Sequence, residues 1–176
     1  MFFLLKERAG KLLEVLRDLI CSDIRPVAQY EYIHVEDADE SPEGRDILPD
    51  ADASDWQTIT NAEVWGGHRE RFYFRTTVVI PREFAGKRVI YELRTGREGE
   101  WDAVNPQFMA YVNGTPRQGL DVNHRTILLT ECAEAEERFE ILLSAFTGDQ
   151  NFHLLLDSEI KTEEPEIRKY YYDIRL

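Results

Sequence analysis

The segment RFYFRTTVVI at residues 71–80 decides the fold, because aromatic and β-branched side chains follow one another there almost without interruption. Such side chains are enriched in β-strands, where they pack well on a pleated surface. Pro81 comes directly after the segment and ends the strand, since proline has no backbone N–H to donate to a sheet. A turn at 84–87 leads to RVIYEL at 88–93, which has the same character. Two short strands joined in this way predict antiparallel β-structure.

Further strands are expected on both sides of this pair. The strongest local signal is Asn113-Gly114, because both central residues of a type I′ hairpin turn need a positive φ. No regular alternation of strands and helices is visible, so a parallel sheet is not expected. Short strands separated by turns instead predict an antiparallel sandwich or barrel. The additional strands are predicted at 29–35, 107–112, 115–118, 126–130, 137–146 and 152–160, with 170–176 as a candidate for the last.

The amino-terminal region is expected to be helical, from about residue 4 to residue 20. Its leucines and isoleucine recur at spacings of three and four, which places them in one stripe along a helix. A stripe of this kind is usually a packing face, although it could also contact another chain. The stripe consists of Leu12, Leu13, Leu16, Leu19 and Ile20.

We divide the chain into a helical segment 1–25, an irregular acidic region 26–55 and a β-sandwich 56–176, together forming one globular unit. From Glu36 to Asp55 the chain is rich in Asp, Glu, Pro, Ser and Gly and reads as a long loop. An alternative is that this loop binds a calcium ion, because calcium prefers oxygen ligands, but the usual spacing of such ligands is missing.

Composition narrows the function further. The net charge of −13 argues against a nucleic-acid partner, which would be repelled. Cys21 and Cys132 form no metal-binding or redox pair and fit a reducing compartment. The start, MFFLLKER, is too short and too charged for a signal peptide or a membrane span. We therefore expect a cytoplasmic protein with no membrane partner.

The sequence offers no recognisable catalytic centre. It contains no glycine-rich phosphate loop, no nucleophile elbow and no His-Glu-x-x-His segment. Its histidines are scattered, so a metal site would need ligands from distant loops. Acids are plentiful enough for a pair of glycosidase carboxylates, but nothing around them singles such a pair out. The histidines are His34, His68, His124 and His153.

Two places are candidates for carbohydrate binding. Trp101 lies among acids in EGEWD at 98–102, and an indole ring can stack on a sugar while carboxylates bind its hydroxyl groups. Trp56 and Trp65 are expected instead to close the ends of the sandwich. The second place is the polar cluster after the Asn113-Gly114 hairpin, which could bind hydroxyl groups, contact another domain, or only satisfy its own backbone. That cluster is Asp121, Asn123, His124 and Arg125.

Several short motifs follow one another in a particular order along the sandwich. In order and spacing they resemble the amino-terminal β-domain of α-mannosidases of glycoside hydrolase family 38. The resemblance includes the leading helix and runs to residue 148, so it covers most of the chain. It departs from the family at 96–105, which is longer than the usual turn and leaves the role of Trp101 open. The motifs are Trp65-Gly66-Gly67, Phe84-Ala85-Gly86-Lys87, Tyr111-Val112-Asn113-Gly114, Gln118-Gly119-Leu120-Asp121 and Asn123-His124-Arg125.

The resemblance implies a jelly-roll sandwich similar to galactose-binding modules. It also implies that catalysis belongs elsewhere, because in that family the zinc ion and the nucleophile lie in a following α/β domain. The His-x-Asp segment that binds this zinc does not occur in the present sequence. We therefore expect no cofactor in this chain, and we expect the zinc in a separate catalytic domain of the same parent polypeptide.

Three functions follow as hypotheses. The first is a non-catalytic domain of an α-mannosidase that packs on the catalytic domain and shapes the edge of its substrate cleft through Asp121, Asn123, His124 and Arg125. The second is an autonomous carbohydrate-binding module for α-mannosides, with Trp101 as its platform. The third is a protein-interaction domain that uses the leucine stripe of the first helix.

Overall fold

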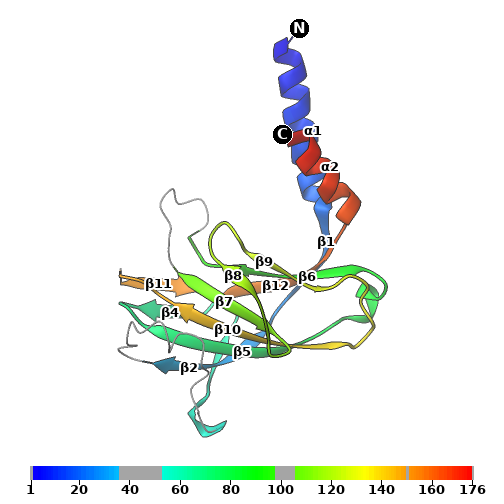
Figure 1. Ribbon diagram of the computed structural model, residues 1–176. Helices are drawn as coiled ribbons and strands as arrows, with labels where there is room; N and C mark the ends of the chain where they lie inside the picture. Colours follow the sequence, from blue (N-terminus) through cyan, green and yellow to red (C-terminus); the bar gives the residue numbers. More distant parts are fainter. Residues whose placement is uncertain (1, 36–52, 98–105, 150, 176) are drawn as a thin grey trace.

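A computed structural model describes residues 2–35, 53–97, 106–149 and 151–175, and in it two antiparallel sheets pack face to face (Figure 1). The predicted fold class, a mainly β antiparallel sandwich with an amino-terminal helix, is confirmed. The larger sheet has six strands in the order β3-β2-β5-β10-β7-β8. These are β2 (Gln29–Val35), β3 (Gln57–Thr60), β5 (Arg71–Val79), β7 (Gln107–Val112), β8 (Thr115–Leu120) and β10 (Arg138–Phe146).

The smaller sheet has four strands in the order β1-β12-β6-β9. They are β1 (Cys21–Pro26), β6 (Arg88–Arg94), β9 (Thr126–Thr130) and β12 (Asp157–Glu163). A third, two-stranded sheet joins β4 (Val64–Gly67) to β11 (Phe152–Leu155). The type I′ hairpin is confirmed: Asn113 and Gly114 have φ values of 51° and 72°, and Val112 pairs with Thr115.

The core lies between the two large sheets and follows the period of two expected for strands. In β10, Phe139, Ile141, Leu143 and Ala145 are buried, while the residues between them face outward. Trp65 also belongs to the core, with its ring edge-on to several phenylalanine rings, which confirms the expectation that it closes the sandwich. Trp56 has a different role, because the guanidinium of Arg75 lies 3.8 Å from the centre of its ring.

Two helices stand away from the sandwich, and both ends of the chain lie on them (Figure 1). The first, α1 (Phe2–Ile20), matches the predicted helix. The second, α2 (Pro165–Arg175), packs along α1, and the N–H of Glu164 donates to the carbonyl of Ile20 at 2.8 Å. No helix in the part of the chain that the structure describes is both long and apolar enough to cross a bilayer.

The strand expected at 170–176 was wrong, because α2 occupies this region. Three consecutive tyrosines favour a strand locally, but Pro165 at the first helical position and Glu166 in the first turn favour a helix. Packing along α1 then stabilises a helix that is too short to persist alone. Three strands escaped prediction, namely β1, β3 and β4, and the strand expected at 152–160 is divided at Leu156 into β11 and β12.

Candidate functional site

The loop at 121–125 is arranged around the carboxylate of Asp121. Its Oδ1 accepts the backbone N–H groups of Asn123 and His124, each at 2.7 Å. The Nδ1 of His124 lies 3.2 Å from the same oxygen, and the N–H of Asp121 donates to the carbonyl of His124 at 3.0 Å. Of the alternatives for this loop, the self-satisfying turn is therefore the one that Asp121 forms.

The ionisation of Asp121 fits this role. Partial burial opposes ionisation, but hydrogen bonds from the backbone of His124 and Asn123 outweigh it, so the pKa of the carboxyl lies below its ordinary value. The carboxylate is thus charged at neutral pH and fixed in place. The imidazole of His124 is mostly exposed and is free to contact a partner on its outer side.

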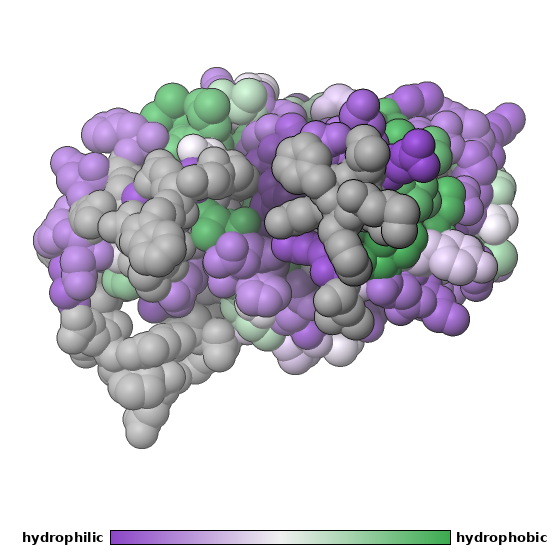
Figure 2. All heavy atoms as spheres, turned by 90° about the horizontal axis from the view of Figure 1, so that it is seen from above, coloured by the Kyte–Doolittle hydropathy of each residue, from purple (hydrophilic) through white to green (hydrophobic). Residues whose placement is uncertain are grey.

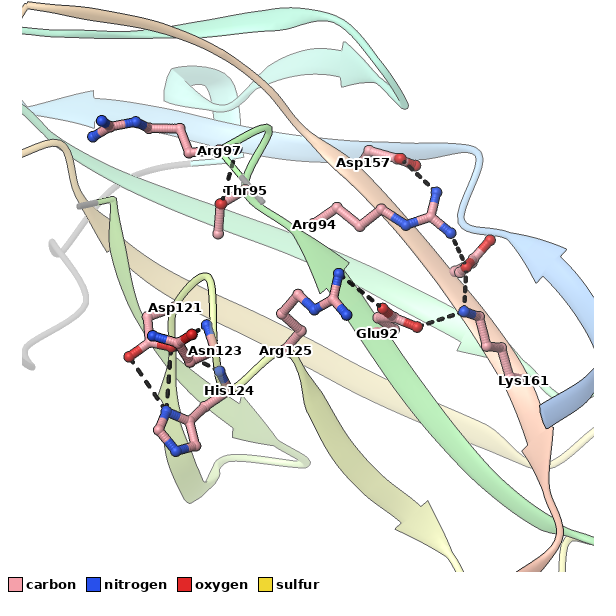
Figure 3. A network of polar contacts seen from close by, with 11 residues as sticks. Glu92, Arg94, Thr95, Arg97, Asp121, Asn123, His124, Arg125, Asp157 and Lys161 are labelled. Atoms are coloured by element: carbon pink, nitrogen blue, oxygen red, sulfur yellow. Dashed lines mark hydrogen bonds and ion pairs between the residues drawn. The ribbon is translucent and has the colours of Figure 1, made fainter. Parts of the chain in front are cut away.

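Arg125 leaves this loop and connects it to the four-stranded sheet (Figure 3). Its Nη1 lies 3.7 Å from Oε1 of Glu92 on β6, while its backbone carbonyl accepts the N–H of Leu93 at 2.9 Å. The four predicted residues are therefore near one another, but they divide into two groups. Asp121, Asn123 and His124 form the turn, and Arg125 joins a charged network on the sheet.

We call this network the charged ladder; it consists of Glu92, Arg94, Arg125, Asp157, Glu159 and Lys161. Lys161 lies between two acids, in contact with Glu92 and 2.6 Å from Glu159. Arg94 contacts Glu159 and lies 3.0 Å from Asp157. The ladder is on the outer face of the sheet, because its members alternate along the strands with core residues such as Tyr91 and Ile160.

The ladder is shielded from solvent although it lies on an outer face. Only 11% of the Lys161 side chain and 10% of the Glu92 side chain are exposed. Desolvation lowers the pKa of Lys161, but hydrogen bonds to Glu159 and Glu92 and their charges more than compensate, so its net pKa is raised. Lys161 is therefore held as a cation between two carboxylates.

This arrangement suits recognition and positioning better than proton transfer or nucleophilic attack. Each basic group of the ladder is engaged by an acid, so none is held as a free base or nucleophile. Among the described residues, no three or more His, Cys, Asp or Glu side chains are placed to hold a metal ion. Cys21 and Cys132 are both free thiols.

Trp101 lies outside the described residues, as do residues 36–52 of the acidic region. The described chain before this gap ends at Arg97, whose N–H donates to Oγ1 of Thr95 at 3.3 Å (Figure 3). The proposed roles of Trp101 and of a calcium-binding loop therefore stay predictions.

The sequence did not reveal Glu92, Glu159 and Lys161 as members of a site. A signal existed, because DSEIKTE at 157–163 alternates charged residues with uncharged ones in a segment predicted to be a strand. Such a strand has one charged face, and pairing with β6 places Arg94 beside Asp157 and Glu159 on that face.

Comparison with known proteins shows where this fold occurs. No described protein family matches the sequence, and no curated protein matches it either. Solved structures do match. A β-glucuronidase from Ruminococcus gnavus in complex with C6-substituted uronic isofagomine superposes with a TM-score of 0.50 at 10% identity, over 80% of this chain and 29% of that chain. The same enzyme in complex with D-glucuronic acid gives the same values.

A further structure of Ruminococcus gnavus β-glucuronidase matches at 6% identity and a TM-score of 0.50, over 80% of this chain and 28% of that chain. At such low identity the likeness establishes the fold alone. The sandwich is thus a fold that also occurs within a glycoside hydrolase chain. This chain spans less than a third of the length of the enzymes that it matches.

Proposed function

We propose that this chain is a non-catalytic accessory domain of a carbohydrate-active enzyme, and that the parent enzyme is an α-mannosidase of glycoside hydrolase family 38. The observation that carries the proposal is the fold, which superposes on a fraction of a glycoside hydrolase chain and not on the whole of it. The finer assignment to an α-mannosidase rests on the ordered motifs between Trp65 and Gly148.

The charged ladder and the Asp121 turn support a role beside a catalytic domain. Their fixed, already paired side chains form a rigid surface with little freedom to lose when another domain docks on it. His124 extends from this surface with most of its side chain exposed. We assign Asp121, Asn123, His124 and Arg125 to the edge of the substrate cleft, where the turn holds His124 towards the partner.

The helix pair offers a second contact with the rest of the parent protein. Leu13, Leu16 and Ile20 of α1 are half-buried, and their spacing places them towards α2. Beside them lies a second row, Leu12, Val15 and Leu19, of which about half of each residue is exposed. We call this second row the open row of α1.

The open row continues onto α2. Tyr170 and Ile174 are 55% and 41% exposed and lie next to the half-buried Ile167 and Tyr171. Because the two helices run antiparallel, helical geometry places these residues on the same side of the pair as the open row. Apolar patches also interrupt the hydrophilic surface seen from above, the side from which the helices project (Figure 2). A contiguous apolar side of this kind is typical of a contact surface.

The test begins with the coding sequence around this chain. The proposal expects a family 38 catalytic domain, with its His-x-Asp zinc segment, in the same or a neighbouring reading frame. Mixed with that domain, the chain should elute with it in size-exclusion chromatography and alter the kcat or KM of α-mannoside hydrolysis. Replacing Asp121, Asn123, His124 and Arg125 by alanine should remove this kinetic effect.

A matched control uses polar residues of α1 that face away from the open row, Glu14→Gln and Arg17→Gln, which should leave both association and kinetics unchanged. If no such catalytic domain is encoded, or if hydrolysis is the same with and without the chain, the assignment to an α-mannosidase is wrong. A stable oligomer of this chain alone would instead favour a protein-interaction domain. Saturable binding of α-mannosides that Trp101→Ala abolishes would favour an autonomous binding module.

A further inference from the structure

A small hollow lies at the end of the sandwich where β4 and β11 form the two-stranded sheet. Its volume is about 250 Å³, below the range of roughly 300–1,000 Å³ that pockets for drug-sized ligands occupy. Aromatic rings and imidazoles form much of its lining. The residues that matter for the argument are Tyr32, His34, Trp65, Gly66, Phe72 and His153.

One buried side-chain nitrogen of this lining has no partner among the described residues. It is Nε1 of Trp65, since Nε2 of His34, which also lacks an aligned hydrogen bond, lies 2.6 Å from Oε2 of Glu70. Trp65 is only 5% exposed. Leaving a buried N–H unsatisfied costs about 1–3 kcal/mol, so such groups are uncommon unless something else binds them. An indole N–H without a partner in the lining of a hollow points to a ligand that carries a hydrogen-bond acceptor oxygen.

An acid lies next to this hollow, and the backbone makes room for it. Oε2 of Glu70 is 2.6 Å from Nε2 of His34, and both side chains are about one quarter exposed. A Cβ atom on Gly67 would come within 2.4–2.6 Å of the Glu70 carboxyl group. Glycine at this position therefore allows the carboxylate to lie against the strand and beside the imidazole. This gives a structural reason for glycine at 67 in Trp65-Gly66-Gly67.

Ring geometry fixes the walls of the hollow. His34 stacks on Phe72 with ring centres 4.4 Å apart and planes 9° apart, and Trp65 meets Phe72 edge-on at 5.3 Å. These contacts fix the rings in the core and place apolar surface next to the N–H of Trp65. Flat C–H faces and ring hydroxyls are what a pyranose presents to such a site.

We propose that this hollow binds a single pyranose ring, with Trp65 Nε1 donating to one of its hydroxyl oxygens and the Glu70 carboxylate, held by His34, adjacent to it. Its small volume admits one sugar residue and not a chain. The net charge of −13 disfavours anionic ligands and favours a neutral sugar. The carbohydrate class of this ligand rests on the proposed function, but the site is separate from the charged ladder and the Asp121 turn.

A larger groove of about 620 Å³ on the six-stranded sheet is a weaker candidate. Its Arg75 is already bound, since Nε donates to Glu31 at 2.7 Å and the guanidinium stacks on Trp56. No unsatisfied buried group points to a ligand there among the described residues.

The experiment is a titration of the chain with methyl α-D-mannopyranoside, methyl β-D-glucopyranoside and methyl β-D-galactopyranoside, followed by protein NMR and tryptophan fluorescence. We expect at least one pyranoside to bind saturably with millimolar affinity and to shift the indole N–H resonance of Trp65. Trp65→Phe keeps an aromatic ring but removes the N–H, and His34→Phe keeps a ring but removes the nitrogen that holds Glu70. Each should weaken binding about tenfold, the effect of one lost hydrogen bond to a ligand.

Three controls make the result specific. Trp56→Phe, on the other sheet surface, and Tyr172→Phe, on the exposed side of α2, should leave pyranoside binding unchanged. Thermal unfolding of each variant shows whether it is folded, and if Trp65→Phe does not fold, His34→Phe and the Trp65 resonance of the unmodified chain decide. No saturable shift with any pyranoside, or equal binding by the folded variants, overturns the proposal. Association with a catalytic domain can persist in that case, so failure of this site and failure of the proposed function are distinguishable.

Discussion

At the scale of single residues, Gly67 is constrained both by its backbone conformation and by the side chain that lies against it. Its φ is +147°, in the region that side chains other than glycine rarely adopt, and the Glu70 carboxyl occupies the place of a Cβ. We predict that Gly67→Ala destabilises the protein by about 1–3 kcal/mol, chiefly through backbone strain, because Glu70 is flexible enough to move aside. Urea unfolding measures the change.

The matched control is Gly10→Ala. A Cβ atom on this glycine in α1 would meet nothing within 4 Å, and alanine is the better helix former by about 1 kcal/mol. We expect this variant to be as stable as the parent or more stable. Equal destabilisation by the two substitutions would show that Gly67 has no particular backbone role.

Residue patterns predicted some details of the site and missed others for physical reasons. Asn113-Gly114 identified its own turn, because the φ requirement is local. The polar residues at 121–125 do lie near one another, but only the structure shows that Asp121 organises the turn whereas Arg125 contacts Glu92 on β6. The hollow beside Trp65 was not foreseen, since His34, Trp65 and Phe72 lie on three different strands and their contact depends on the fold.

At the scale of elements, periodicity predicted the strands that carry a full alternation of buried and exposed residues. Short strands such as β3 and β4, each of four residues, contain too few alternating positions to be recognised from the sequence. The α2 helix was mistaken for a strand because tyrosine side chains favour strands when nothing else decides. Packing along α1 decides here, and Ile167 and Tyr171, the half-buried residues of α2, have the four-residue spacing that it requires.

The charged ladder makes a prediction about strands β6 and β12. Lys161→Met would leave Glu92 and Glu159 shielded from solvent without the cation that lies between them. We expect a loss of about 3 kcal/mol in the free energy of unfolding, typical for removing one partner of a buried ion pair. Thermal or urea unfolding measures it, and adding Glu92→Gln to the same variant should recover part of the loss.

Lys87→Met serves as the control for this prediction. Lys87 also has a carboxylate partner, with Nζ 2.5 Å from Oδ2 of Asp23, but its side chain is 42% exposed. Water screens such a pair, so we expect a change below about 1 kcal/mol. If both variants lose the same stability, the ladder contributes no more than a surface ion pair.

At the scale of the whole molecule, one buried polar contact ties the two large sheets together. The hydroxyl of Tyr30, on β2 of the six-stranded sheet, lies 2.6 Å from the hydroxyl of Tyr91 and 2.5 Å from Oγ of Ser158. Tyr91 and Ser158 belong to the four-stranded sheet, on β6 and β12. All three side chains are buried, so each depends on the others for its hydrogen bonds.

This contact predicts alkaline instability. Burial raises the pKa of Tyr91 to about 12 and that of Tyr30 well above its ordinary value, so both stay protonated in the folded protein. The unfolded chain ionises both near pH 10, where it begins to bind fewer protons than the folded protein. The contribution of these two tyrosines to the free energy of unfolding should therefore be constant below pH 10 and fall above it, by about 1.4 kcal/mol per pH unit for each tyrosine. Urea unfolding between pH 10 and 12 measures this slope.

Tyr91→Phe should reduce that slope by the contribution of one tyrosine, about 1.4 kcal/mol per pH unit, because only Tyr30 is then kept neutral by the fold. At neutral pH the same variant should lose about 1 kcal/mol, since Tyr30 keeps its hydrogen bond to Ser158. Tyr172→Phe is the matched control: Tyr172 lies on α2 with 48% of its surface exposed, so its removal should leave the slope unchanged. The parent and the two variants share their lysines and remaining tyrosines, so the contributions of these groups to the slope cancel in the comparison. Equal slopes for the parent and Tyr91→Phe would contradict the prediction, because they would show that folding does not keep Tyr91 neutral.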